Sequence, residues 1–182
     1  MRLIFRLFFA VMMIIAGLTT QLPKISAPPS QTNYSLDIDS RFSRRDRQII
    51  IEALSEYQRF GIYFWPTTET QSVDLHIKQW FNITNARIGE CHPNLATVFL
   101  DAERTETDIQ LRALTIHEVG HFLGMNHICE YPTESYDCSP TLYGPAIMNP
   151  FLLPNHIIHF SSLDIIEFNR ARRIYASVPH IR

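Results

Sequence analysis

The sequence lacks any excess of charge of one sign. Its 182 residues include 16 Lys and Arg against 18 Asp and Glu, so the formal net charge is −2. No run of basic residues could neutralise a row of phosphates, and we therefore expect no nucleic-acid partner. Internal repeats and low-complexity segments are also absent, and the length suits one domain. With 46% hydrophobic and 19% charged residues, the composition is that of an ordinary soluble globular protein.

A hydrophobic stretch long enough for a standard membrane span, roughly 20 residues, is missing as well. The longest apolar run, Leu7–Leu18, follows Arg2 and Arg6 and is typical of the core of a secretory signal. It is followed neither by a clear A-x-A cleavage pattern nor by a cysteine that could carry a lipid. We expect residues 1–20 to be a signal peptide and the protein to be secreted or extracytoplasmic. The alternative is an uncleaved N-terminal anchor, which would be the protein's contact with a membrane.

The polar, Pro-rich stretch that follows predicts a linker or short pro-segment over residues 21–39. This stretch is too short for a folded prodomain, and it contains no cysteine. Regular patterning begins at Ser40, so we expect one globular domain over residues 40–178, present as a monomer.

Cysteine is scarce and odd in number. Cys129 and Cys138 bracket a short polar loop, and we expect them to form a disulfide, which suits an exported protein. Cys91 would then be a free thiol. Pairing of Cys91 with either of the other two stays open.

The first helical pattern covers residues 44–60. Ser43 and Asp46 form a capping box, after which apolar residues recur at helical spacing. Gly61 should end this helix because glycine readily adopts the left-handed conformation of a helix C-terminus.

Two further helices are predicted downstream. One runs from about 108 to 123 with Thr107 as its N-cap, and the other begins at a second capping box, Ser161 and Asp164, and ends near 176. The segment 128–154 between them is rich in Pro, Tyr and Ser and is predicted to be irregular. Short stretches rich in β-formers or of alternating polarity predict strands at 62–65, 73–80, 86–91 and 95–100.

The stretch HEVGHFLGMNH holds the residues that point to chemistry. His117 and His121 are four residues apart and therefore lie on one face of a helix, one turn apart, where both imidazoles can bind a single Zn²⁺. Gly124 can reverse the chain and return His127 as the third ligand. Three imidazoles leave one coordination position for water, as in catalytic rather than structural zinc sites. Glu118 is placed to reach that water.

This motif resembles the long zinc motif of metzincin metallopeptidases, closest to single-domain matrixin-like catalytic domains. The resemblance covers about residues 40–176 and includes the early strand VDLHIKQW and the closing segment HFSSLDIIEFNRARRIY. It implies one catalytic Zn²⁺ on the three histidines, with Glu118 as general base. It also implies a Met-turn at AIMNP, in which Met148 forms an apolar floor beneath the ligands. No calcium site can be identified, and Ile128 does not match the residue that follows the motif in familiar subfamilies.

The resemblance also implies an α+β fold. We expect a metzincin-like (zincin) domain with a small twisted mixed β-sheet, two helices packed on it, and an irregular C-terminal subdomain that ends in a third helix. An edge strand within 86–100 should pair with an extended substrate, although the sequence does not decide which of the two strands there does so.

The implied function is that of an exported zinc endopeptidase acting on proteins or peptides. The apolar residues Pro150, Phe151, Leu152 and Leu153 follow the expected Met-turn and would wall the S1′ pocket, favouring a hydrophobic P1′ residue. Packing of these side chains on the core is an equal alternative. The alternative function is a binding or toxin-like protein of the same fold, with one dedicated target and little general protease activity.

Overall fold

A computed structural model describes residues 31–67, 72–81, 87–128, 146–149 and 159–177, all within one compact unit, Gln31–Arg182. The strands are β1 (Thr32–Ile38), β2 (Ile62–Pro66), β3 (Leu75–Gln79), β4 (Gly89–His92) and β5 (Thr97–Leu100). The α-helices are α2 (Arg44–Ser55), α3 (Asp108–Phe122) and α5 (Ser162–Ser177), and short 3-10 turns cover Glu56–Phe60, Pro93–Leu95 and Ala102–Arg104.

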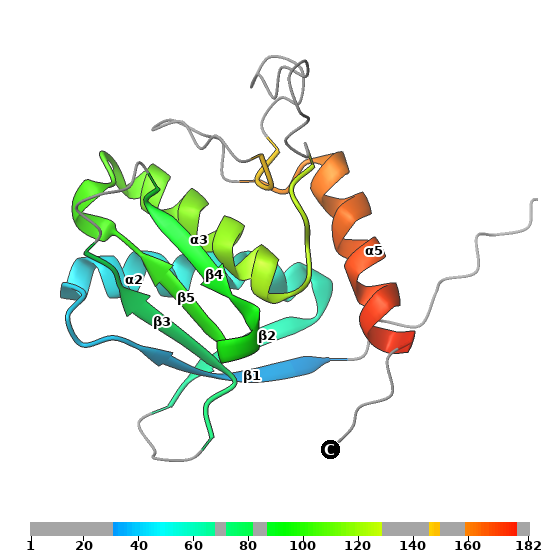
Figure 1. The fold of residues 1–182 in the computed structure, drawn as a ribbon, viewed down its shortest axis with the longest axis horizontal. Helices are drawn as coiled ribbons and strands as arrows, with labels where there is room; N and C mark the ends of the chain where they lie inside the picture. The colour runs from blue at the N-terminus through cyan, green and yellow to red at the C-terminus, as the bar shows by residue number, and fades with distance from the viewer. Residues whose placement is uncertain (1–30, 68–71, 82–86, 129–145, 150–158, 178–182) are drawn as a thin grey trace, which may run out of the picture. The chain divides into compact units, whose positions relative to one another are not determined.

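The five strands form one mixed sheet in the order β2-β1-β3-β5-β4. β1 pairs in parallel with β2 and β3, β3 pairs in parallel with β5, and β4 runs antiparallel to β5 at the edge. Helices α2 and α3 lie together on one face of the sheet (Figure 1). Alternate side chains of the strands point to that face and are fully or almost fully buried there: Leu36, Leu75, Ile77, Val98 and Leu100. The fold is therefore α+β with a small mixed sheet and two main helices, as predicted.

Strand β1 corrects the predicted domain boundary. It lies within the range 21–39 that was expected to be a linker, yet it pairs on both sides inside the sheet. Its apolar residues Tyr34, Leu36 and Ile38 alternate with Asn33, Ser35 and Asp37, a half-buried strand pattern next to a Pro-rich stretch whose composition suggested a linker.

The first predicted helix begins where it was expected to begin, and its C-terminal turn is a 3-10 helix. The Ser43 side chain accepts from the Asp46 backbone N–H at 3.1 Å, and the Asp46 carboxylate accepts from the Ser43 N–H at 3.2 Å. The last turn, Glu56–Phe60, is a 3-10 helix, and Gly61 ends it at φ 77°. Tyr57 in this turn is fully buried and donates its hydroxyl to the Ile116 carbonyl of α3 at 2.6 Å.

The other predicted elements are present with shifted ends. Thr107 caps α3 by accepting from the Gln110 N–H at 3.1 Å. Ser161 and Asp164 form the predicted capping box of α5, with Ser161 Oγ 3.2 Å from the Asp164 N–H. All four predicted strands exist, and Pro93 begins the short 3-10 turn between the last two. No helix among the described residues is both long and apolar enough to cross a membrane.

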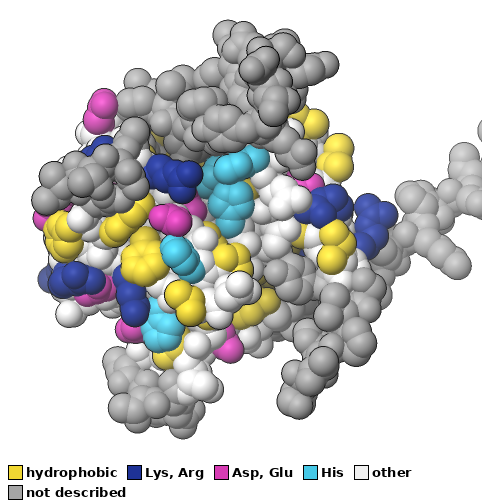
Figure 2. Space-filling view, in the orientation of Figure 1, with side chains coloured by type: hydrophobic (Ala, Val, Ile, Leu, Met, Phe, Trp, Pro, Cys, Tyr) yellow, Lys and Arg dark blue, Asp and Glu magenta, His cyan; other side chains and the backbone are white. Residues whose placement is uncertain are grey.

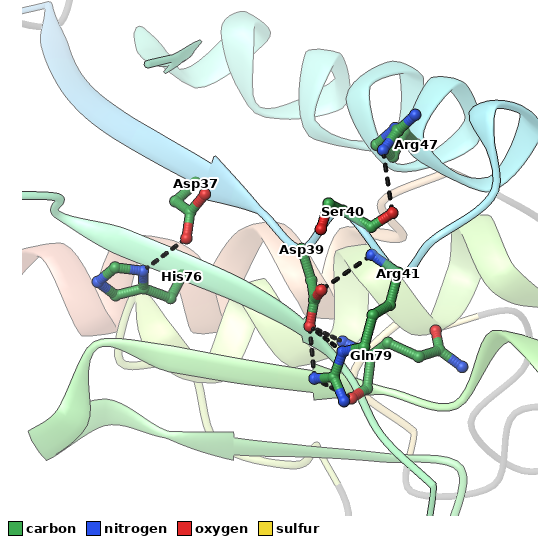
Figure 3. A network of polar contacts seen from close by, with 7 residues as sticks. All are labelled: Asp37, Asp39, Ser40, Arg41, Arg47, His76 and Gln79. Atoms are coloured by element: carbon green, nitrogen blue, oxygen red, sulfur yellow. Dashed lines mark hydrogen bonds and ion pairs between the residues drawn. The ribbon is translucent and has the colours of Figure 1, made fainter. Parts of the chain in front are cut away.

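A polar network fixes the end of β1 against β3 (Figure 3). The Asp39 carboxylate accepts from the Arg41 N–H at 2.9 Å and from Arg41 Nε at 2.8 Å, and Arg41 Nη2 donates to the Gln79 carbonyl at 3.2 Å. The Arg41 guanidinium lowers the pKa of Asp39 below its usual value. In the same view, Asp37, two residues before Asp39 on β1, pairs with His76 of β3 at 3.1 Å. The network therefore ties the chain between β1 and α2 to the neighbouring strand.

Candidate metal centre

Helix α3 is buried along most of its length, because the sheet, α2 and the turn at 146–149 surround it. At Gly120 two methionine side chains come very near the helix backbone: a Cβ there would lie 2.6 Å from Met148 Sδ and 3.3 Å from Met125 Sδ. The absence of a side chain at this position therefore lets both methionines, each buried, pack directly against the helix backbone.

The chain reverses direction at the end of α3. Gly124 has φ 83°, a left-handed conformation that a residue with a Cβ rarely adopts. The Met125 N–H donates back to the Gly120 carbonyl at 2.9 Å, so the reversal is closed by a hydrogen bond to the helix. This turn returns His127 to the face of α3 that carries the other two histidines.

The three histidines converge on one point. Their Nε2 atoms are separated by 3.2 Å between His117 and His121, 3.2 Å between His117 and His127, and 3.1 Å between His121 and His127. Two nitrogens at about 2.0–2.1 Å from a tetrahedral zinc would lie about 3.3–3.4 Å apart. The cluster thus matches the ligand spacing of such an ion, and among the described residues it is the group of His, Cys, Asp and Glu that could hold a metal.

Hydrogen bonds on the far side of two rings support this assignment. His117 Nδ1 donates to the Ile147 carbonyl at 2.7 Å, and His121 Nδ1 donates to the Met125 carbonyl at 2.9 Å. A neutral imidazole that donates from Nδ1 carries a lone pair on Nε2. The Nε2 lone pairs of His117 and His121 face each other in the cluster and repel each other. A cation bound by both nitrogens removes this repulsion.

Burial also favours neutral rings. It lowers the pKa of His121, and it lowers the pKa of His127 to about 4, helped by the nearby His121 ring. Both rings are therefore uncharged at neutral pH, which is the form that binds a metal. His121 and His127 are each partly exposed, so the cluster reaches solvent on one side. Figure 2 shows histidine side chains at the surface of the face it views.

Glu118 follows His117 directly in α3 and is almost fully buried. Burial, assisted by the Glu90 carboxylate and opposed by Arg87, raises its pKa to about 8. Gly89 on the edge strand β4 packs against it, since a Cβ at Gly89 would lie 2.8 Å from a Glu118 carboxylate oxygen and 2.7 Å from Leu114 Cδ1. The carboxyl group is thus an easily protonated, confined group between helix and edge strand.

The turn at 146–149 is fastened by helix α5. The Asp164 carboxylate, which is fully buried, accepts from the backbone N–H groups of Ile147 and Met148, both at 2.9 Å, in addition to its capping bonds to Ser161. Ile147 in turn holds the His117 ring through its carbonyl. Sequence reasoning identified Asp164 as a cap and missed this second role, because nothing in the local sequence shows which distant backbone a cap residue will meet.

No protein-family model matches this sequence. No curated protein matches it either. Solved structures do: archaemetzincin from Methanopyrus kandleri matches with a TM-score of 0.53 and 12% identity over 82% of this chain and 99% of that one. Myroilysin matches with a TM-score of 0.50 and 14% identity over 82% of this chain and 95% of that one. The fold is metzincin-like.

The structure brings together the three predicted zinc ligands. It also buries Glu118, the residue that follows His117, and it buries Met148 completely in a turn that contacts α3. Two strands were predicted within residues 86–100. Of these, β4 lies at the edge of the sheet and β5 is internal.

The remaining predicted residues fall into two groups. Cys91 is a free thiol, and burial raises its pKa to about 12, so it stays protonated at neutral pH. Outside the described residues lie the predicted disulfide partners and the predicted S1′ wall: Cys129, Cys138, Pro150, Phe151, Leu152 and Leu153.

Proposed function

We propose that this chain is a zinc-dependent endopeptidase that hydrolyses peptide bonds in protein or peptide substrates. The convergence of the Nε2 atoms of His117, His121 and His127, with a buried carboxyl group adjacent in sequence, carries the proposal. The metzincin-like fold supports it, because the same fold is found in the peptidases named above.

The residues of this chain suit that reaction. Bound zinc would lower the pKa of a coordinated water and polarise the carbonyl of the substrate. Glu118 would accept the proton of the attacking water and deliver it to the leaving amine. Its burial weakens the hydration of the carboxylate and so increases its basicity, which suits a group that must both take and release a proton near neutral pH.

The edge strand β4 would hold the substrate. Its outer edge has no partner strand among the described residues, and an extended peptide can pair with such an edge through backbone hydrogen bonds. Because Gly89 of β4 lies against Glu118, a peptide on this edge would pass directly by the general base.

The finer assignments belong to the same proposal. We propose that the enzyme is exported through residues 1–20, that it is matrixin-like with Met148 as the floor of the metal site, and that it prefers a hydrophobic P1′ residue. Cleavage of a peptide library checks the last point, and charged residues at P1′ among the best substrates would contradict it.

The deciding experiment combines metal analysis with a Glu118→Gln variant. The wild-type protein should contain one zinc and digest casein in a chelator-sensitive manner. The variant should keep its zinc and lose about 10²–10⁴-fold in turnover, the usual contribution of a general acid–base group. Glu52→Gln, at an exposed position on α2, is the matched control and should cleave like the wild type.

The outcomes separate the candidate functions. A Glu118→Gln protein that cleaves as well as the wild type would contradict the general-base assignment. Bound zinc without any cleavage by the wild type would favour the binding or toxin-like alternative.

A further inference from the structure

The third histidine is oriented differently from the other two. His117 and His121 lie on α3, and their Nδ1 atoms donate to carbonyl groups. His127 lies beyond the helix, and its Nδ1 makes no hydrogen bond to any of the residues that the structure describes. No hydrogen bond from Nδ1 to the described residues therefore fixes this ring, and the backbone on either side of it determines where the ring can lie.

That backbone is held on both sides. After His127, the Ile128 N–H donates to the Met148 carbonyl at 3.2 Å. Before it, the Asn126 N–H donates to Glu167 Oε1 on helix α5 at 2.7 Å. A hydrogen bond between a backbone N–H and a carboxylate is stronger than one between two neutral groups, so the contact with Glu167 is the firmer of the two.

Glu167 is itself held in place. Arg170, one turn further along α5, donates from Nε to Glu167 Oε2 at 2.7 Å and from Nη2 to Oε1, so the guanidinium grips both carboxylate oxygens. Arg170 Nη2 also reaches the Gly124 carbonyl at 3.4 Å, at the point where the chain reverses. Hydrogen bonding to Arg170 lowers the pKa of Glu167, so the carboxylate is ionised at neutral pH. The pair thus contacts both ends of the short segment 124–126.

We infer that Glu167 and Arg170 are positioning residues for the third zinc ligand. They fix the segment between Gly124 and Asn126, and this segment sets where the His127 ring lies relative to the other two. The inference rests on the proposed zinc centre, but it does not depend on which bond the enzyme cleaves.

The test measures Zn²⁺ affinity by competition with a chromogenic chelator. Glu167→Ala should weaken Zn²⁺ binding about 10–100-fold, as loss of a residue that orients a ligand does. Arg170→Ala should weaken it less, because Glu167 can still accept from Asn126. Arg173→Ala is the control and should bind Zn²⁺ like the wild type, because this exposed side chain bonds, among the described residues, only to the Asn169 carbonyl of its own helix.

A double-mutant cycle distinguishes positioning from general loss of structure. In a His127→Ala background the ligand that Glu167 positions is gone, so adding Glu167→Ala should cause almost no further loss of Zn²⁺ affinity. An equal loss in both backgrounds, or no loss in either, would overturn the inference.

Failure of the proposed function gives a different result. If the wild type binds Zn²⁺ and the cycle behaves as expected but no substrate is cleaved, the positioning role stands and the peptidase proposal is wrong. If the wild type binds no Zn²⁺ at all, both are overturned.

Discussion

The fully buried carboxylate of Asp164 offers a sharp test of how the metal centre is supported. Its Oδ2 accepts from the Ile147 N–H at 2.9 Å and from Ser161 N and Oγ at 2.8 and 2.7 Å, and its Oδ1 accepts from the Met148 N–H at 2.9 Å. Asp164→Asn preserves the shape but leaves one oxygen. In the best orientation this oxygen keeps three bonds, and the new NH₂ group faces the Met148 N–H.

The cost follows from that count. A lost hydrogen bond to a charged group is worth about 1.5–3 kcal/mol. The remaining three bonds become neutral and weaker, while the cost of burying a charge disappears, and these two changes oppose each other. We expect the free energy of unfolding of the zinc-free protein to fall by about 2 kcal/mol. Because Ile147 also holds the His117 ring, Zn²⁺ affinity should fall by about tenfold or more.

Urea titration with an unchanged m-value measures the first effect, and chelator competition measures the second. Asp46→Asn is the matched control, because Asp46 forms the same capping box with Ser43 and, among the described residues, its carboxylate bonds to Ser43 alone. That control should cost only about 0.5–1 kcal/mol and leave Zn²⁺ affinity unchanged. If Asp164→Asn destabilised no more than Asp46→Asn, the carboxylate would not be supporting the 146–149 turn.

Three further predictions concern close contacts and protonation. Gly89→Ala places a Cβ 2.8 Å from a Glu118 oxygen, so turnover should fall about 10- to 100-fold at unchanged zinc content; unchanged turnover would contradict the close approach. Gly120→Ala places a Cβ 2.6 Å from Met148 Sδ, and overpacking of about 1–3 kcal/mol should outweigh a helix-propensity gain of about 1 kcal/mol. Urea titration should therefore show lower stability, and higher stability would mean that the Met148 side chain moves aside freely. Folding lowers the pKa of His127 from 6.5 to about 4, so between these pH values the unfolded chain binds more protons than the folded chain. The free energy of unfolding of the zinc-free protein should therefore decrease as the pH falls from 6.5 toward 4. A His127→Ala variant whose stability depends on pH in the same way would refute this.

The ligands could be predicted from the sequence because they are a local feature. Helical periodicity alone places His117 and His121 on one face, and a glycine at the helix end predicts the reversal that returns His127. The capping boxes that start α2 and α5 were readable for the same reason, since each involves residues three apart.

The supports of the site could not be predicted, because they are long-range contacts to backbone atoms. Neither the bond from His117 to the Ile147 carbonyl nor the bond from Asn126 to Glu167 depends on a side-chain pattern near the motif. Strand β1 was missed for a different reason. Its alternation was visible in the sequence, but the Pro-rich composition just before it suggested a linker.

The distance along the chain between the histidines and their supports has a consequence for biosynthesis. Thirty residues separate His117 from Ile147, and 41 separate Asn126 from Glu167. Since a ribosome delivers the chain from its N-terminus, His117 and His127 emerge well before the groups that orient them. A nascent or truncated chain can thus carry all three histidines before the ion site is well ordered. The ability to bind the ion would be complete only once helix α5 has been synthesised.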